Sequence, residues 1–122
     1  MILQFDFSSD IPIYQQIRNQ VVIGIAEGKL LPGEHLPTIR ALAEESGINM
    51  MTVSKAYQIL KSEGYITTDR RSGAVIADRR DGVVSEEHIA ALRLALSQVR
   101  LSGMSVKDAM ALCKKLYEEG AK

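Results

Sequence analysis

The chain has 122 residues, enough for one compact domain or for a small domain with an appendage. Hydrophobic residues make up 46% and charged residues 25%, and the 15 basic and 15 acidic side chains give a net charge of zero. This balance excludes a disordered, highly charged chain and a protein that coats nucleic acid by bulk charge, so any nucleic-acid site must be a local patch.

The first predicted element is a helix from Pro12 to about Glu27. Proline suits the first helical position because it lacks the N–H that would be unpaired there, and Gly28 follows as a stop signal. Apolar residues recur on one face of this helix at spacings of three and four, which predicts an inward stripe. The stripe consists of Tyr14, Ile17, Val21 and Ile25.

Two short helices are predicted next, over residues 39–46 and 50–63. Thr38 and Asn49 precede them as candidate N-caps, and Gly47 ends the first. Because only about three residues separate the two helices, they have the layout of a helix-turn-helix, whose second helix can enter a DNA major groove. The inward face of that second helix is predicted to hold Val53, Ala56, Tyr57 and Leu60.

A β-hairpin is predicted after the helix-turn-helix. Two β-prone runs, 65–68 and 74–77, flank a polar turn that contains Gly73. A helix-turn-helix followed directly by a hairpin is typical of a winged helix, and His35 with Leu36 could supply a short third strand.

The C-terminal part is predicted to be a two-helix hairpin after a charged linker, with Ser85 and Ser105 as N-caps. About 35 residues cannot bury two apolar stripes unaided, so we expect the same hairpin of a second subunit to cover them. The stripes proposed for dimerisation are Ile89, Leu92, Leu96 and Val99 on the first helix and Met110, Cys113, Leu116 and Tyr117 on the second.

The second helix of the helix-turn-helix and the hairpin carry the local positive charge. Lys55 is predicted on the exposed helix face, and Arg70 and Arg71 at the hairpin tip, where cations could neutralise phosphates. A solvated, charged surface would show the same excess. The exposed first turn adds two adjacent methionines, Met50 and Met51, which could contact thymine methyl groups or, for one of them, pack on the preceding turn.

Several sequence motifs follow one another along the chain in the order and at the spacing found in one protein family. Residues 36–43 read Leu-Pro-Thr-Ile-Arg-Ala-Leu-Ala, and residues 47–57 read Gly-Ile-Asn-Met-Met-Thr-Val-Ser-Lys-Ala-Tyr. With Pro-Ile-Tyr-Gln-Gln-Ile at 12–17 and Glu-Gly-Tyr-Ile at 63–66, they resemble the GntR family of bacterial transcription regulators over about residues 10–77. The short two-helix C-terminal part resembles the YtrA-like subfamily.

The resemblance implies roles for individual residues and a DNA operator as partner. Implied DNA contacts are Arg40, then Asn49, Thr52, Ser54 and Lys55, and the hairpin tip with Arg70, Arg71, Ser72 and Gly73. Gly73 and its neighbours match the wing tip that reaches the minor groove in this family. Two segments depart from the family pattern. Asn49-Met50-Met51 replaces Asn-Pro-Asn, which could mark an altered operator preference, and Arg71-Ser72-Gly73-Ala74 replaces a Gly-x-Gly-Thr-like wing. The family also implies repression, often of adjacent transporter genes.

An enzyme is not predicted. His35, His88 and Cys113 fall in three different predicted elements, and no P-loop, GxSxG or HExxH pattern is present. We expect no cofactor and no metal, with metal sensing through His88 and Cys113 as a weak alternative. The apolar runs are shorter than the roughly 18 residues of a membrane span, and the first residues lack a signal-peptide layout, so we expect a soluble cytoplasmic protein.

The sequence therefore predicts a mainly α fold with a small β-hairpin: a winged helix-turn-helix over 1–77, a linker over 78–84, and a two-helix dimerisation region over 85–122. The predicted function is a sequence-specific transcription regulator, favoured as a repressor, that binds a two-fold symmetric operator as a homodimer. The alternative is a winged-helix protein-interaction module without DNA binding. A small-molecule effector, at the dimer interface or between the two parts, stays open.

Overall fold

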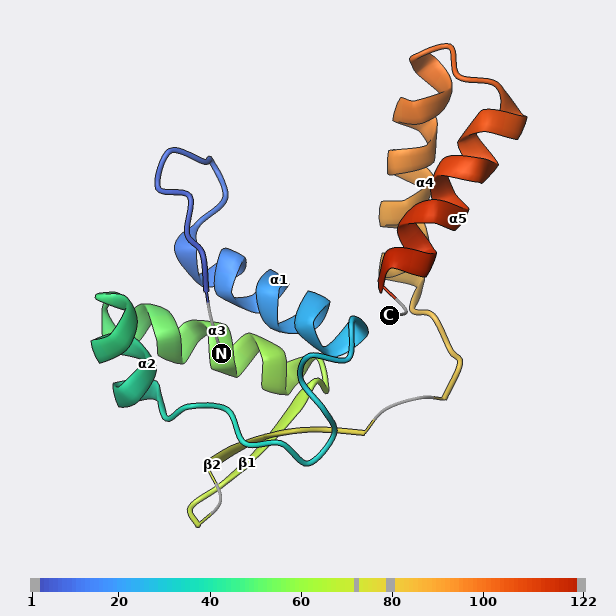
Figure 1. Ribbon diagram of the computed structural model, residues 1–122. Coiled ribbons are helices and arrows are strands. Elements are labelled where there is room, and N and C mark those ends of the chain that lie inside the picture. Colours follow the sequence, from blue (N-terminus) through green and yellow to red (C-terminus); the bar gives the residue numbers. More distant parts are fainter. Residues whose placement is uncertain (1–2, 72, 79–80, 121–122) are drawn as a thin grey trace. The chain divides into compact units, whose positions relative to one another are not determined.

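The computed structural model describes residues 3–71, 73–78 and 81–120, and every structural statement below concerns those residues. The chain divides into two compact units, Met1–Arg79 and Arg80–Lys122, each described by itself. The elements, in chain order, are α1 (Ile13–Ala26), α2 (Ile39–Ser46), α3 (Met50–Ser62), β1 (Ile66–Asp69), β2 (Gly73–Ile76), α4 (Glu86–Leu101) and α5 (Val106–Gly120) (Figure 1). The predicted mainly helical fold with one small hairpin is confirmed.

The first unit is built around α3, against which α1, α2 and β1 all pack (Figure 1). Removal of aliphatic side chains from water drives this packing, at roughly 1.5–3 kcal/mol for each fully buried one. The predicted inward face of α3 is confirmed, because all four of its residues are buried. The core consists of Ile17, Val21, Leu30, Leu36, Leu42, Ala43, Val53, Ala56, Tyr57, Leu60, Ile66, Ala74 and Ile76.

The turn between α2 and α3 follows from three local signals. Thr38 caps α2 by accepting a 3.0 Å hydrogen bond from the Ala41 N–H. Gly47 ends α2 in the left-handed region, with φ 72°, and its N–H donates to the Ala43 carbonyl at 2.9 Å. Glycine adopts this conformation without the steric cost that a Cβ would add. Asn49 then caps α3, which fixes where the exposed tip of that helix begins.

The start of α1 differs by one residue from the prediction. Pro12 has φ −56° and ψ 149°, so it is the N-cap and not the first helical residue. Its carbonyl still accepts the first helical bond, from the Gln16 N–H at 3.0 Å. The buried Gln16 side chain also anchors the segment before the helix, because its amide nitrogen donates to the carbonyls of Asp6 and Ile11 at 2.9 and 2.8 Å.

The hairpin pairs β1 and β2 antiparallel, from Ile66 opposite Ile76 to Asp69 opposite Gly73. β1 begins one residue later than predicted, because Tyr65 still bonds back to α3 through its N–H to the Leu60 carbonyl at 2.9 Å. β2 begins one residue earlier than predicted, because Gly73, expected in the turn, already pairs with Asp69. The predicted third strand is reduced to a single bridge between His35 and Val75.

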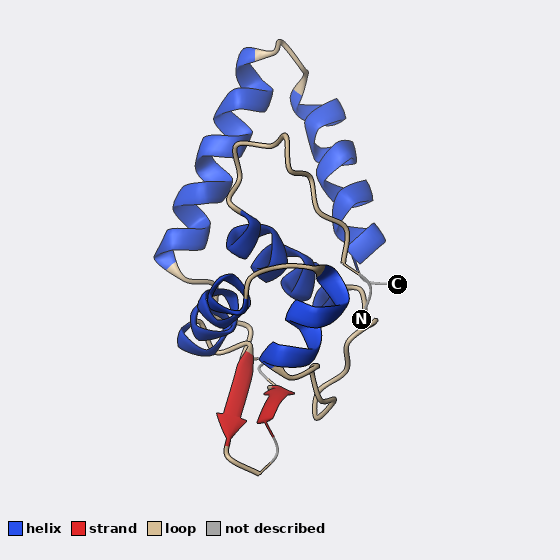
Figure 2. Ribbon diagram, turned by 90° about the vertical axis from the view of Figure 1, so that its left-hand side faces the viewer, coloured by secondary structure: helices blue, strands red, loops and turns tan. Residues whose placement is uncertain are grey.

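The second unit is a helical hairpin in which α4 and α5 run antiparallel (Figure 2). Ser85 and Ser105 cap the two helices as predicted, accepting from the N–H groups of His88 and Asp108 at 3.2 Å each. None of the described side chains in this unit is buried. Within the described residues, no helix is both long enough and apolar enough to cross a membrane.

Candidate nucleic-acid interface

The N-terminal tip of α3 presents one polar and two apolar side chains to solvent. Asn49 Oδ1 accepts the Met51 N–H at 2.7 Å, which closes the first turn while the residue stays exposed. The side chain of Met51 is 80% exposed and that of Met50 is 48% exposed. The alternative that one methionine packs on the preceding turn therefore does not apply to Met51. Met50 and Met51 together form a small exposed apolar patch at the tip of α3.

The remaining predicted contact residues of α3 divide into two groups. Thr52 and Ser54, implied as DNA contacts by the resemblance, are half-buried, because they lie beside the inward face of the helix. Lys55 is exposed as predicted, and its Nζ lies 4.0 Å from the centre of the Tyr14 ring. A cation over an aromatic face is attracted by the ring quadrupole, so α1 helps to position this ammonium group. The contact between Lys55 and Tyr14 was not predicted from the sequence.

The other predicted cations lie on α2 and at the hairpin tip. Arg40 is exposed at the second position of α2, and Arg70 and Arg71 are exposed between the two strands. The turn is shaped by Asp69, whose carboxylate accepts the Arg71 N–H at 2.7 Å. Gly73 begins β2 with φ 69°. Ser72, the remaining predicted residue of the tip, lies outside the described residues.

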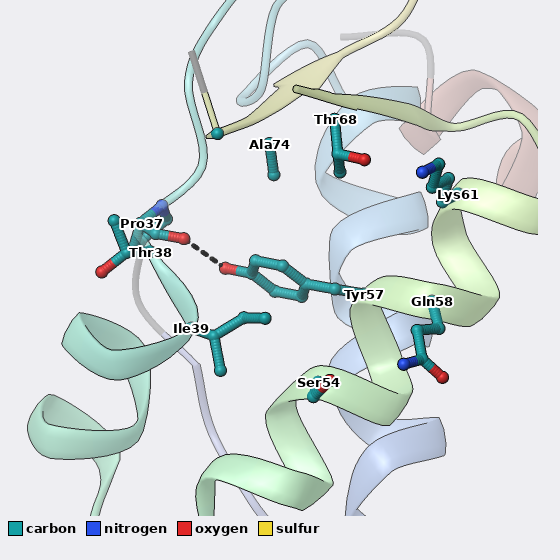
Figure 3. A pocket seen from close by; sticks show the side chains of 10 residues that line it. Pro37, Thr38, Ile39, Ser54, Tyr57, Gln58, Lys61, Thr68 and Ala74 are labelled. Carbon is teal, nitrogen blue, oxygen red and sulfur yellow. Dashed lines mark hydrogen bonds between the residues drawn. The ribbon is translucent and has the colours of Figure 1, made fainter. Parts of the chain in front are cut away.

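A cleft of about 360 Å³ lies between α3, the start of α2 and the hairpin (Figure 3). Its polar side chains are Thr38, Ser54, Gln58, Lys61 and Thr68, and its apolar surface comes from Pro37, Ile39, Tyr57 and Ala74. The described residues that line it include no acid. Gln58, Lys61 and Thr68 are not among the site residues predicted from the sequence, although Ser54, Gln58 and Lys61 have the spacing of one helical face.

Tyr57 forms the centre of this cleft. Its hydroxyl donates a 2.7 Å hydrogen bond to the Pro37 carbonyl, drawn as a dashed line in Figure 3. Burial raises the pKa of Tyr57 to about 12, and the negative charge of Glu45 adds to the shift. The phenol is therefore neutral at physiological pH and acts as a fixed donor to the backbone, not as an acid or base.

The three side chains considered for metal sensing or catalysis belong to three different segments of the chain. His35 is in the loop that bridges to β2, His88 is in the first turn of α4, and the half-buried Cys113 is in α5. His88 Nδ1 is 2.9 Å from the Ser85 hydroxyl, so its ring is engaged at the helix cap. Among the described residues, no group of three His, Cys, Asp or Glu side chains could hold a metal ion.

The two predicted dimerisation stripes lie on α4 and α5 and are largely open in the single chain. Only Val99 and Cys113 among them are half-buried. The exposed fractions of the others run from 41% for Leu96 to 82% for Tyr117. A helix pair that leaves this many large apolar side chains in solvent has a surface suited to a partner.

Comparison with known proteins matches residues 13–76 to the family model described as "Bacterial regulatory proteins, gntR family". The HTH-type transcriptional regulator Rv1152 of Mycobacterium tuberculosis is 34% identical over 88% of each chain. The HTH-type transcriptional repressor YtrA of Bacillus subtilis is 36% identical over 80% of this chain and 75% of its own. Escherichia coli YdcR is 45% identical over 52% of this chain, which is only 14% of that longer protein.

Solved structures show the same fold. A protein titled a transcriptional antiterminator from Listeria monocytogenes superposes with a TM-score of 0.81 at 28% identity, over 100% of this chain and 94% of that one. YtrA from Sulfolobus acidocaldarius, a GntR-family transcription factor, gives 0.60 at 36% identity, over 96% and 97%. The chain also resembles the DNA-binding domain of AraR, solved with operator ORX1, with a TM-score of 0.55 at 26% identity over 63% of this chain and 96% of that one.

Proposed function

We propose that this chain, which belongs to the GntR family of bacterial regulatory proteins and is YtrA-like, represses transcription by binding a two-fold symmetric operator as a homodimer. The observation that carries the proposal is the exposed tip of α3 beside a hairpin with basic side chains. The solved complex of the AraR DNA-binding domain with its operator supports DNA as the ligand of this fold.

The tip of α3 is suited to read bases. Asn49 can bond the edge of an adenine in the major groove, and an apolar side chain can contact the methyl group of thymine. Met51, 80% exposed and without a hydrogen-bonding head group, is suited only to the second kind of contact. We therefore assign sequence discrimination to Asn49, Met50, Met51, Thr52 and Ser54.

The exposed cations are suited to positioning on the duplex. Contacts to phosphates fix a protein's register and raise its affinity for all sequences, whereas contacts to base edges discriminate among sequences. Arg40, Lys55, Arg70 and Arg71 are exposed around the tip of α3 and on the hairpin, and we assign them to backbone contact. Gly73 and Ser72 match the wing tip of the family, and we propose that this tip reaches the minor groove next to the major groove that α3 enters.

We propose that the α4–α5 stripes form the dimer interface, because their large apolar side chains otherwise face water. In a dimer with a two-fold axis, the α4–α5 surface of one subunit contacts the same surface of the other subunit. Such a dimer presents two copies of α3 to one duplex. Two such helices contact half-sites about one helical turn, or a multiple of it, apart. The predicted boundaries of winged helix, linker and dimerisation region are part of this proposal.

Repression is supported by the name of the Bacillus subtilis relative, a transcriptional repressor that shares 36% identity. A bound dimer can block RNA polymerase without any chemical step, so the proposal includes neither an enzymatic activity nor a cofactor. A regulator of this kind acts where the chromosome lies, which places it in the cytoplasm. An effector would act by favouring one geometry of the dimer over another.

The test is selection of bound sequences from a random duplex library with the full chain, followed by footprinting. The proposal predicts enrichment of an inverted repeat, occupied by two chains. Placing that repeat across a promoter should lower reporter expression when the chain is present. If no sequence is enriched even at low salt, the protein-interaction module becomes the better account.

A further inference from the structure

We infer that the cleft between α3, the start of α2 and the hairpin seats the sugar–phosphate backbone of the bound duplex, with Lys61 as a phosphate ligand. This inference rests on the proposed function and extends it to a part of the surface outside the tip of α3. It makes Lys61 a further DNA-binding residue.

The chemistry of the cleft selects an anion. Its polar groups are hydroxyls, the Gln58 amide and the Lys61 ammonium group, and the described residues that line it include no carboxylate. Hydroxyl, amide and ammonium groups are the donors that proteins use toward phosphate oxygens.

The position of the cleft favours DNA backbone over a small anion. In the proposed complex, α3 occupies the major groove and the hairpin reaches the adjacent minor groove. A single sugar–phosphate strand separates these two grooves, so that strand has to cross the surface between α3 and β1. Lys61 of α3 and Thr68 of β1 line the cleft from those two sides (Figure 3).

The apolar part of the cleft suits the same occupant. The Tyr57 ring lies in its centre, held by the hydrogen bond from its hydroxyl to Pro37, and Ile39 lies beside it (Figure 3). The carbon-rich face of a deoxyribose can pack on such a surface while the neighbouring phosphate meets the donors. A volume of about 360 Å³ gives room for part of a nucleotide without a change in the fold.

The first experiment removes the charge of Lys61 or, as a control, of Lys29. It measures the affinity of each variant, and its salt dependence, for the selected operator and for a random duplex. Lys61→Met should weaken binding roughly tenfold on both duplexes, as expected for one charge-assisted contact, and should reduce the salt slope by about one unit. Lys61→Arg should restore both quantities. Lys29→Met removes the same charge from the loop after α1, outside the cleft, and should leave both quantities as in the wild type.

A phosphate scan then locates the contact. Single phosphates of the operator are replaced in turn by neutral methylphosphonates, and the wild type should lose affinity at one phosphate between the two groove contacts. Lys61→Met should be insensitive to that replacement. If the wild type binds the operator but Lys61→Met keeps its affinity and salt slope, the inference is wrong while the proposed function stands. If the wild type binds no duplex, the proposed function itself fails.

Discussion

The hydroxyl of Tyr57 donates a 2.7 Å hydrogen bond to the carbonyl oxygen of Pro37, which ties the middle of α3 to the residue before the N-cap of α2. The bond spans 20 residues of sequence and joins the two helices of the helix-turn-helix at the end opposite to their short turn. It therefore holds α3 in a fixed orientation relative to α2, which any surface that reads DNA requires.

Removal of this hydroxyl tests its contribution. Tyr57→Phe should lower the free energy of unfolding at pH 7 by about 1 kcal/mol, because the half-buried Pro37 carbonyl loses its donor. Urea denaturation monitored by circular dichroism measures the change.

The same variant carries a pH signature. Because the pKa of Tyr57 is raised from 10.0 to about 12 in the folded state, the unfolded state releases its proton first as the pH rises. This residue therefore makes no pH-dependent contribution below pH 10 and destabilises the fold progressively between pH 10 and 12. Tyr57→Phe lacks this loss, so the gap between the two proteins should narrow over that range. A constant gap would show that Tyr57 is not buried as described.

Asn49 combines two roles that substitutions can separate. Asn49→Ser keeps a side-chain oxygen for the N-cap of α3, so its stability should match the wild type, whereas Asn49→Ala should lose about 1 kcal/mol. Both variants should lose roughly 1–3 kcal/mol of affinity for the operator and little for random DNA, because both lack the amide. Fluorescence anisotropy at a temperature where each variant is fully folded gives these affinities. Equal losses of affinity for the operator and for random DNA would show that Asn49 does not read bases.

Lys55 has a similar ambiguity, since its ammonium group lies over the Tyr14 ring. As a phosphate contact, Lys55→Ala should weaken binding to operator and random DNA alike and reduce the salt slope by about one unit, and Lys55→Arg should preserve both. As a purely structural contact, Lys55→Ala would lower the stability and leave the salt slope unchanged. Salt titrations of binding, with urea denaturation of the same samples, separate the two roles.

The dimer interface can be tested with one charge placed at two positions. Leu96→Asp puts a carboxylate within the apolar stripe of α4 and should yield monomers at micromolar concentration, because the interface would have to bury it. Gln98→Asp introduces the same charge at an exposed α4 position outside the stripe and should remain dimeric. Light scattering reports the mass of each variant. If the Leu96→Asp variant remains dimeric, this stripe of α4 is not part of the dimer interface.

The local parts of the fold were predictable because neighbouring residues determine them. Thr38, Gly47 and Asn49 set the bounds of the helix-turn-helix, and each does so through a bond to a residue within four positions. The buried faces of the helices followed from the spacing of their apolar residues. The exposed methionines of the α3 tip were predictable for the same reason.

Contacts between distant segments were not predictable from the sequence. Arg18 pairs with Glu63 through two hydrogen bonds of 2.7 and 2.8 Å, across 45 residues, and it tightens α1 against the end of α3. Nothing near either residue indicates this partner. The cleft around Tyr57 likewise exists only once the hairpin lies beside α3, so Gln58, Lys61 and Thr68 looked like ordinary surface residues. Pro12 fits an N-cap as well as a first helical residue, which explains the shift at the start of α1.

The most direct test of the account is the salt dependence of binding to the selected duplex, measured by fluorescence anisotropy between 50 and 200 mM salt. The account predicts tight binding at low salt, a linear fall of log affinity with log salt concentration, and two chains per duplex at saturation. Asn49→Ala should lower the affinity for the operator at every salt concentration and leave the slope of log affinity against log salt concentration unchanged. Absence of any binding at 50 mM salt, with a chain that is folded by circular dichroism, would contradict the account.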